Sequence, residues 1–251
     1  MIKITSVNND LVKETAKLLK GKYREETGLF LIEGEKGVTE AITAGVKVER
    51  VFVADKEMIK TYQKYDIDFI ETTEAVLSKI SDVKTSPKLV AVARQQKPDF
   101  ERLKNAKKVV LLEGIKDAGN LGTILRTAAA FGIDAIVLFG DVVDLYNPKT
   151  VRSAVGNLWK IPIFKMNTKL ELDKYFNNYE RCATLPTGID VIPLKDYKPE
   201  DKVLMMFGSE ADGLSEDLKE YATKNITIEM QGEVESLNLA VSASIIMYKL
   251  V

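Results

Sequence analysis

One stretch of the sequence decides the fold: VVLLEGIKDAGNLGTILRTAAAFGIDAIVLF, residues 109–139. It opens with an apolar run over 109–113, passes through a loop with three glycines into an apolar helical pattern over 121–132, and ends in a second apolar run over 135–139. Two continuous apolar strands joined by a helix are typical of a parallel sheet that is covered on both faces. This stretch therefore predicts an α/β fold.

The same alternation of strands and helices continues on both sides of this stretch. Toward the C-terminus the pattern predicts strands at 161–164, 181–185, 203–207 and 226–230, and helices at 149–157, 168–178, 215–222 and 236–250. Toward the N-terminus it predicts a smaller α/β/α sandwich with helices at 9–20, 35–44, 56–65 and 73–80, and strands at 29–33, 48–54, 67–70 and 89–93. A polar stretch with Pro98 separates the two parts. We therefore expect a first domain over 1–94, a linker over 95–107 and a second domain over 108–251.

The composition narrows the chemistry. The chain has 251 residues, no histidine and a single cysteine, Cys182. The lack of histidine excludes Ser-His-Asp, Cys-His and HExxH catalysis, and no cysteine pair has zinc-binding spacing, so we expect no metal. No apolar run approaches the length of a membrane span, and the N-terminus has no signal-peptide core, so we expect a cytoplasmic protein without a membrane partner.

The charge is divided unevenly along the chain, although the net charge is only −1. Residues 1–108 hold 21 Lys+Arg against 17 Asp+Glu, which gives +4, while residues 109–251 hold 15 against 20, which gives −5. Such segregation allows a nucleic-acid partner for the first part. The excess of basic residues is concentrated in two clusters, 3–24 and 84–108. Solvated surface lysines explain either cluster equally well.

Three glycine-containing turns follow predicted strands, where open α/β sheets bind their ligands. In the first turn, Gly114 and Gly119 have P-loop spacing, but Asn120 and Leu121 stand where that motif needs Lys and Ser/Thr. Hydrolysis of a nucleoside triphosphate is therefore disfavoured. The helix N-terminus can still hold an anion, and Arg126 adds a cation to the same helix.

The other two turns also carry polar residues. Gly208 and Gly213 frame Glu210, an arrangement that suits either a flat ligand or a tight turn with a solvated carboxylate. Ser236 is a candidate N-cap for the last helix, with Asn238 beside it. None of the three turns is a dinucleotide-binding fingerprint.

Together these turns resemble a known family. Asn120-Leu-Gly-x-Ile-x-Arg126-Thr-Ala, Gly208-Ser-Glu210-x-x-Gly213-Leu and Ser236-Leu-Asn238-x-Ala-Val look like the three ordered motifs of the SpoU (TrmH-like) family of RNA 2′-O-ribose methyltransferases, in the SPOUT superfamily. The likeness covers 109–251. Residues 4–8, Arg24 and 28–34 resemble the family's substrate-binding domain, an L30e-like α/β/α domain with the fold of a small RNA-binding ribosomal protein.

The resemblance implies a fold, a reaction and a set of roles. It implies a trefoil-knotted C-terminal domain that binds S-adenosyl-L-methionine and transfers its methyl group to a ribose 2′-hydroxyl of structured RNA. Because a separate domain resembles a ribosomal protein, ribosomal RNA is favoured over tRNA. By position, the resemblance implies catalytic roles for Asn120, Arg126, Glu210, Ser236 and Asn238, and cofactor contacts by Gly208, Ile228, Met230 and Leu237. The chain's basic residues suggest RNA contacts by Lys20, Lys22, Arg24 and Arg152.

Partners and alternatives complete the prediction. We expect a homodimer through the C-terminal domain, because the last helix carries Leu239, Ile246, Met247 and Leu250 beside small residues, a surface too apolar to leave exposed. Three other interpretations stay open: an RNA-binding paralogue without catalysis, a SPOUT methyltransferase that acts on an RNA base, and an enzyme of free nucleotides. The first would lose motif residues, the second would lack Asn120 and Arg126 in this arrangement, and the third would not need the first domain.

Overall fold

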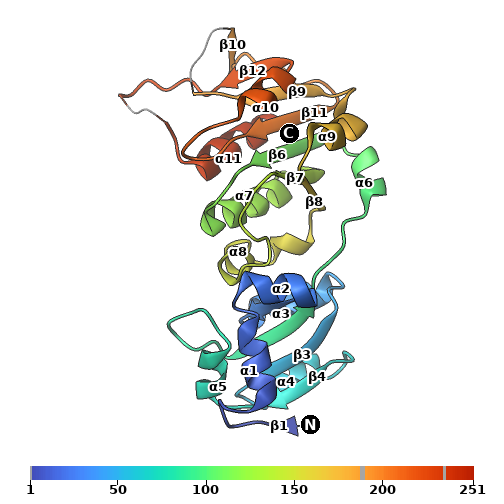
Figure 1. Cartoon of the computed structure of the whole chain (residues 1–251), viewed down its shortest axis with the longest axis vertical. Helices are drawn as coiled ribbons and strands as arrows, with labels where there is room; N and C mark the ends of the chain where they lie inside the picture. The colour runs from blue at the N-terminus through green and yellow to red at the C-terminus, as the bar shows by residue number, and fades with distance from the viewer. Residues whose placement is uncertain (1, 187–189, 234–235) are drawn as a thin grey trace. The chain divides into compact units, whose positions relative to one another are not determined.

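The computed structural model describes residues 2–186, 190–233 and 236–251. These residues form two compact units (Figure 1). The first comprises residues up to Lys97 together with Asp144–Trp159, and the second comprises Pro98–Val143 and Lys160–Val251. The sequence pattern predicted continuous domains and did not indicate that the segment 144–159 packs with the first unit.

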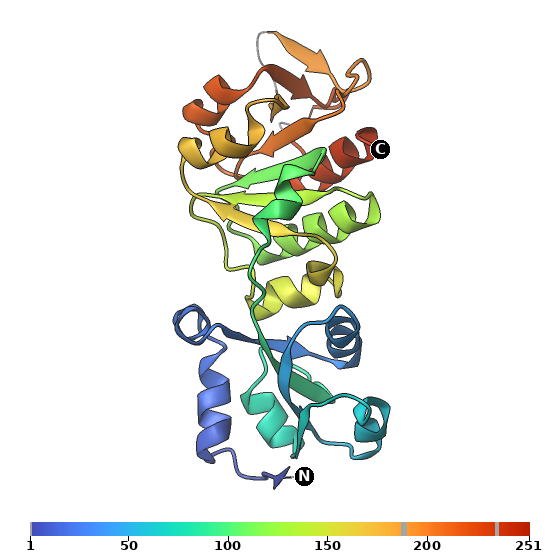
Figure 2. The ribbon, with the colours of Figure 1, turned by 90° about the vertical axis from the view of Figure 1, so that its right-hand side faces the viewer.

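The first unit is a mixed sheet between helices, as expected. Its described strands run in the order β1 (Ile2–Lys3), β4 (Asp68–Glu71), β3 (Val48–Val53), β5 (Leu89–Arg94), β2 (Leu29–Glu33). The helices are α1 (Asp10–Lys17), α2 (Gly21–Thr27), α3 (Glu35–Thr43), α4 (Glu57–Tyr62), α5 (Glu74–Lys79), α8 (Pro148–Ser153) and the 3₁₀ turn η1 (Asn157–Trp159). One hydrophobic cluster joins α1 and α5 to the sheet, while α3 and α4 lie on the opposite face (Figure 2).

The second unit contains a parallel sheet, which confirms the α/β prediction. Its described strands run in the order β10 (Val191–Pro193), β12 (Lys224–Thr227), β9 (Glu180–Thr184), β11 (Val203–Phe207), β6 (Lys108–Glu113), β7 (Ala135–Phe139), β8 (Ile163–Met166). Among the described residues, the strands of this sheet pair in parallel. The helices are α6 (Phe100–Lys104), α7 (Ala118–Ala130), α9 (Lys169–Phe176), α10 (Glu216–Tyr221) and α11 (Leu239–Lys249).

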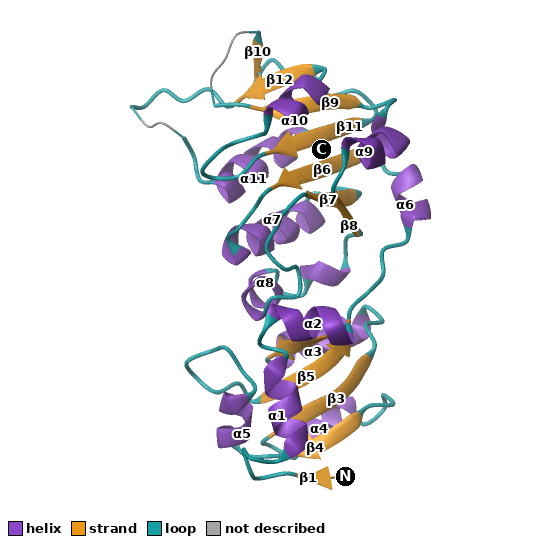
Figure 3. Ribbon diagram, in the orientation of Figure 1, coloured by secondary structure: helices purple, strands orange, loops and turns teal. Residues whose placement is uncertain are grey.

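Both faces of this sheet are buried. Val109 and Leu111 of β6 belong to a cluster with residues of α6, α9 and α10, while their neighbours Val110 and Leu112 are equally buried. Figures 2 and 3 show α7 and α11 side by side on the other face. Alternate side chains of a strand point to opposite faces, so a sheet covered on both sides needs uninterrupted apolar strands.

Several boundaries differ from the predicted ones. The helix predicted over 9–20 corresponds to α1, which ends at Lys17, and the separate helix α2, which begins at Gly21, was not predicted. The predicted linker contains α6, whose N-cap Asp99 accepts a hydrogen bond from the backbone N–H of Glu101. Helix α11 begins at Leu239 rather than at Ser236. The pattern also missed two short strands, β1 and β10.

Candidate active site

The three glycine-containing turns lie at one edge of the second unit's sheet. They follow β6, β11 and β12, and β11 pairs in parallel with both β6 and β9, while β9 pairs in parallel with β12. The carboxyl ends of parallel strands meet at the same edge of a sheet, where ligands bind in folds of this class. The fold therefore gathers the three predicted motifs.

The turn after β6 fixes the start of α7. Gly114 has φ +64°, a left-handed conformation that glycine adopts without strain. Asp117 is the N-cap of α7, and its carboxylate accepts a hydrogen bond of 2.8 Å from the backbone N–H of Asn120. An Asp three residues before Asn120 is a sequence signal for an N-cap that our prediction did not use. This cap holds Asn120 in the first turn of the helix.

The turn after β11 is a closed hairpin. Ser209 and Gly213 exchange two backbone hydrogen bonds of 3.1 Å. A Cβ at Gly208 would lie 1.9 Å from the carbonyl carbon of Gly213, so a side chain at position 208 would break the hairpin. The carboxylate of Glu113, at the end of β6, accepts a 2.8 Å hydrogen bond from the backbone N–H of Ser215. The hairpin is thus anchored at both ends and carries Glu210 exposed between them.

Three of the predicted catalytic residues form one hydrogen-bonded cluster. The side-chain amide of Asn120 donates to Oε1 of Glu210 at 2.6 Å, and the amide of Asn238 donates to Oδ1 of Asn120 at 3.1 Å. The three side chains come from the three different turns. Glu210 forms no ion pair with any residue that the structure describes, so a neutral amide is the partner of its carboxylate.

Arg126 and Ser236 lie apart from this cluster. Arg126 is exposed on α7, six residues after Asn120, and at about 100° of helix per residue the two side chains leave α7 about 120° apart. Ser236 is exposed, and the predicted N-cap there is wrong: Asn238 caps α11 by accepting from the backbone N–H groups of Ala240 and Val241. Ser236 lies two residues outside the cap, too early to reach the helix's first donors.

The four predicted cofactor residues border the same edge. Gly208 is buried directly after β11. Ile228 and Met230 follow β12, which ends at Thr227, and Leu237 is half-buried just before the cap of α11. The sequence pattern had placed Ile228 and Met230 inside a strand. Because they lie beyond it, their backbone groups take no part in the pairings of β12 with β10 and β9.

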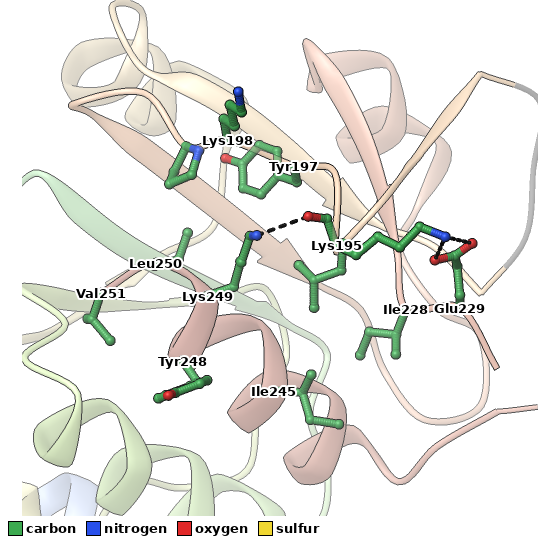
Figure 4. Close-up of a pocket in the computed structure, with 12 residues that line it drawn as sticks. Lys195, Tyr197, Lys198, Ile228, Glu229, Ile245, Tyr248, Lys249, Leu250 and Val251 are labelled. Atoms are coloured by element: carbon green, nitrogen blue, oxygen red, sulfur yellow. Dashed lines mark hydrogen bonds and ion pairs between the residues drawn. The ribbon is translucent and has the colours of Figure 1, made fainter.

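A cavity of about 820 Å³ lies beside this region, between the turn after β10, the segment after β12 and the end of α11 (Figure 4). Ile228 lines it, whereas Gly208, Met230 and Leu237 do not. Lys195 lines the cavity, and its Nζ forms an ion pair with Glu229. The backbone carbonyl oxygen of Lys195 accepts a hydrogen bond from Nζ of Lys249. Ile245 and Tyr248 of α11 form its apolar side.

The predicted RNA-binding residues of the first unit differ in their availability. Lys20 and Lys22 are exposed. The side chain of Arg24 is only 3% exposed, and it donates to the carbonyl oxygen of Leu18 at 2.7 Å and to Asp144 at 2.6 Å. Its predicted phosphate contact is therefore not supported, because the guanidinium is buried against these acceptors.

Arg152 is also engaged. Its guanidinium donates to Glu33 at 2.5 Å and to Asp82 at 3.2 Å, and the side chain of Glu33 is 3% exposed. Glu33 additionally accepts from the hydroxyl of Ser81 and the backbone N–H of Asp82. Arg152 therefore holds α8 to β2 within the first unit, and a phosphate would have to replace two carboxylates.

Other reactive groups are few. Within residues 2–186, 190–233 and 236–251, no group of three or more His, Cys, Asp or Glu side chains could hold a metal ion. Burial raises the pKa of the Cys182 thiol to about 12, which removes it as a nucleophile at neutral pH. None of the helices in the described ranges has the length and apolarity needed to cross a membrane.

Comparison with known proteins gives the family. The model of the SpoU rRNA Methylase family matches residues 107–248, and the model of the MRM3-like substrate binding domain matches residues 9–91. The chain belongs to the SpoU rRNA methylase family. The resemblance drawn from the three motifs is confirmed, and the second match coincides with most of the first predicted domain.

Relatives and solved structures agree with this family over nearly the whole chain. The 23S rRNA (guanosine(2553)-2′-O)-methyltransferase RlmP of Bacillus subtilis is 33% identical over 251 residues, which cover 100% of this chain and 99% of the relative. An AdoMet-bound rRNA methyltransferase from Sinorhizobium meliloti superposes with a TM-score of 0.87 at 28% identity, covering 98% and 96%. An RNA 2′-O ribose methyltransferase superposes with a TM-score of 0.81 at 30% identity, covering 99% and 97%.

Proposed function

We propose that this chain transfers a methyl group from S-adenosyl-L-methionine to a ribose 2′-hydroxyl of ribosomal RNA. The observation that carries the proposal is the hydrogen-bonded cluster of Asn120, Glu210 and Asn238 at the ligand-binding edge of the sheet. Full-length similarity to a 23S rRNA 2′-O-methyltransferase supports it. Other relatives are named for a uridine or an adenosine, so the family leaves the nucleotide open.

The residues at this edge fit S-adenosyl-L-methionine. Gly208 lets the hairpin close tightly at the end of β11, and Ile228, Met230 and Leu237 offer apolar side chains together with backbone groups outside strands and helices. An exposed carboxylate that lacks a cationic partner, Glu210, also suits a ligand of positive charge. When bound, the cofactor supplies an electrophilic methyl group on a sulfonium, which needs no metal.

The chain's own residues position the reactants. Arg126 carries a guanidinium that stays protonated, so we assign it the target phosphate rather than the hydroxyl proton. Asn120 and Glu210 orient the ribose at the cofactor, and Asn238 supports them. Holding two reactants in line lowers the barrier by more than a single proton transfer does. Ser236, exposed beside this edge, keeps the ribose contact that the family resemblance implies.

We further propose a homodimer through α11, but by a different face from the predicted one. Leu239, Ile246, Met247 and Leu250 are buried in the second unit's own core and are not free for a partner. The exposed apolar residues are Val241, Ile245 and Tyr248, with Tyr248 69% exposed. Their spacing places them on one side of the helix. A second copy seated there would help to complete the RNA site, and RNA would then extend over both subunits.

Light scattering tests the dimer. We expect twice the chain mass for the wild type and a monomer of reduced activity for Tyr248→Glu. A wild-type monomer with full activity would refute the shared site. The whole chain is the right sample, because residues 144–159 pack in the first unit and a fragment over 107–251 would lose those contacts. The proposal also includes the trefoil knot that the family resemblance implies and a cytoplasmic location.

Methyl transfer is tested with ribosomal RNA from a strain in which the gene is deleted. We expect mass spectrometry of the nucleosides to detect one new 2′-O-methylated nucleotide after incubation with enzyme and S-adenosyl-L-methionine, with EDTA present. A methylated base would favour the sister activity, binding without transfer would favour the inactive paralogue, and a strict zinc requirement would contradict the metal-free mechanism.

A further inference from the structure

A chain of hydrogen bonds connects the N-terminus of α11 to the exposed carboxylate of Glu210. Oδ1 of Asn238 accepts from the backbone N–H groups of Ala240 at 3.0 Å and Val241 at 3.3 Å. The amide nitrogen of Asn238 donates to Asn120, whose amide nitrogen in turn donates to Glu210. Each link passes from one of the three turns to the next.

The helix determines the direction of this chain. Backbone N–H groups can only donate, so the side-chain oxygen of Asn238 has to face them and its NH₂ group has to face Asn120. Asn120 must then present its oxygen to Asn238, which turns its NH₂ group toward Glu210. The orientation of the Asn120 amide, otherwise free to flip by 180°, is therefore set from α11.

This orientation matters to Glu210. An amide turned the other way would place its oxygen against the carboxylate, and two acceptors without a hydrogen between them repel each other. With the NH₂ group toward it, Oε1 is held at 2.6 Å. Oε2 accepts no hydrogen bond from any residue that the structure describes, so it keeps its acceptor capacity for a ligand.

We propose that Asn238 is a positioning residue that acts through Asn120, fixing the amide direction that holds Glu210 with one carboxylate oxygen turned to the reactants. The inference rests on the proposed methyl transfer. It differs from a direct role, in which Asn238 would itself touch ribose or cofactor, and from a purely structural role, in which Asn238 would only cap α11.

Two substitutions separate these roles. Asn238→Asp preserves an N-cap acceptor, but it cannot donate to Asn120. Asn238→Ser also preserves an acceptor, adds no charge and is too short to make the same contact. We expect both variants to melt at or near the wild-type temperature and to lose kcat on the order of 10- to 100-fold, as reactive groups displaced by less than a contact distance do. The dissociation constant for S-adenosyl-L-methionine, measured by calorimetry, should change much less.

A double-mutant cycle tests whether Asn238 acts through Asn120. If it does, adding Asn238→Ser to Asn120→Ala should lower kcat by less than about threefold beyond Asn120→Ala alone, because the link is already broken. If Asn238→Ser lowers kcat by the same factor in the Asn120→Ala variant as in the wild type, Asn238 has a direct role and the proposal is overturned. Unchanged kcat in Asn238→Ser, or a loss that follows a fall in melting temperature, would show a structural role and also overturn it.

The matched control is Asn9→Asp. Asn9 caps α1 by accepting from the backbone N–H of Leu11, and its side chain has no part in the cluster. We expect this variant to retain wild-type kcat. If the wild type itself transfers no methyl group, the proposed function fails, but side-chain amide NMR still tests the hydrogen-bond chain from Asn238 through Asn120 to Glu210. We expect the Asn120 amide resonance to shift in both Asn238→Ser and Glu210→Gln. An Asn120 resonance that does not shift in one of these variants would refute the hydrogen-bond chain.

Discussion

In the second unit the exposed Glu210 faces the neutral amide of Asn120, whereas in the first unit Glu33 and Asp144 each face an arginine. In the second unit, the carboxylate of Glu210 therefore keeps an oxygen that can accept a hydrogen bond from a ligand. Arg24 and Arg152, two of the four residues predicted to bind RNA, instead connect the segment 144–159 to α2 and to β2. A charged residue is therefore available to a ligand only where its charge is unpaired or where its ion pair is exposed and weak.

We expect the largest effect on methyl transfer from a substitution in the second unit. Arg126→Ala removes an exposed side chain, so folding and cofactor binding should stay nearly unchanged. Methyl transfer should fall on the order of 100- to 1,000-fold, as it does when one charge-stabilising donor is lost from a transition state. Arg126→Lys keeps the charge without the planar fork and should lie in between. Turnover of the Ala variant at the wild-type rate would remove Arg126 from the mechanism.

The first unit should respond in stability rather than in chemistry. Arg24→Ala removes the guanidinium that donates to the carboxylate of Asp144 and to the carbonyl of Leu18, and the loss of hydrogen bonds from a charged group should cost about 2 kcal/mol. Calorimetric unfolding of the full chain measures the loss. Combining it with Asp144→Ala should cost less than the sum of the two single changes. If stability were unchanged while RNA affinity fell, Arg24 would be a phosphate contact after all.

These arginines also show where sequence reasoning ends. The apolar periodicity predicted the strands of the second unit other than the short β10, and the edge at which its motifs meet, because residue spacing fixes a strand and its following turn. Helix α2 was missed because its single buried residue is Arg24, which a hydrophobic pattern counts as exposed. Its burial depends on Asp144, 120 residues away in the chain, and no local signal reports such a partner.

The last helix gives a related lesson. Apolar residues occur around most of α11, so the sequence predicts burial without telling which side meets the core and which side stays exposed. In the structure, Ile246 and Met247 are buried in the core, whereas Ile245 and Tyr248 are exposed. The cap was misplaced for a similar reason: Ser236 and Asn238 are both good N-cap residues, and only the helix start distinguishes them.

A second carboxylate sharpens the comparison within one unit. The side chain of Glu180 is 5% exposed and binds Lys224, the hydroxyl of Tyr197 at 2.5 Å and a backbone N–H. Its carboxylate is therefore buried and bound by the protein's own donors, whereas the carboxylate of Glu210 is exposed. Burial opposes its charge, but the bonds from Lys224, Tyr197 and Glu200 outweigh burial and lower the pKa of Glu180 below its ordinary 4.5. Glu180→Gln should cost about 2 kcal/mol at pH 7, as lost hydrogen bonds to a charged group do.

The pH dependence has a definite sign. A carboxyl group with a lowered pKa stabilises the fold above its unfolded value, and this contribution is lost as pH falls through the folded pKa. Wild-type stability should therefore decline below about pH 4.5, and Glu180→Gln should show a shallower decline over the same range. Urea denaturation at pH 7, 5 and 4 measures both. Parallel curves for the two proteins would contradict the pairing.

The smallest effect concerns the lysines that remain free to bind RNA. Lys22 is 79% exposed and forms an ion pair with Glu26 at 3.8 Å, so a phosphate can displace that contact at little cost. A lysine that neutralises one phosphate releases about one counterion, so Lys22→Ala should reduce the slope of log affinity against log salt by about 1. Lys60→Ala, an exposed lysine on α4 with a similar acidic neighbour, is the control and should leave the slope unchanged. Equal slopes for wild type and Lys22→Ala, or equal losses at both lysines, would show that the first unit's charge acts diffusely rather than through this contact.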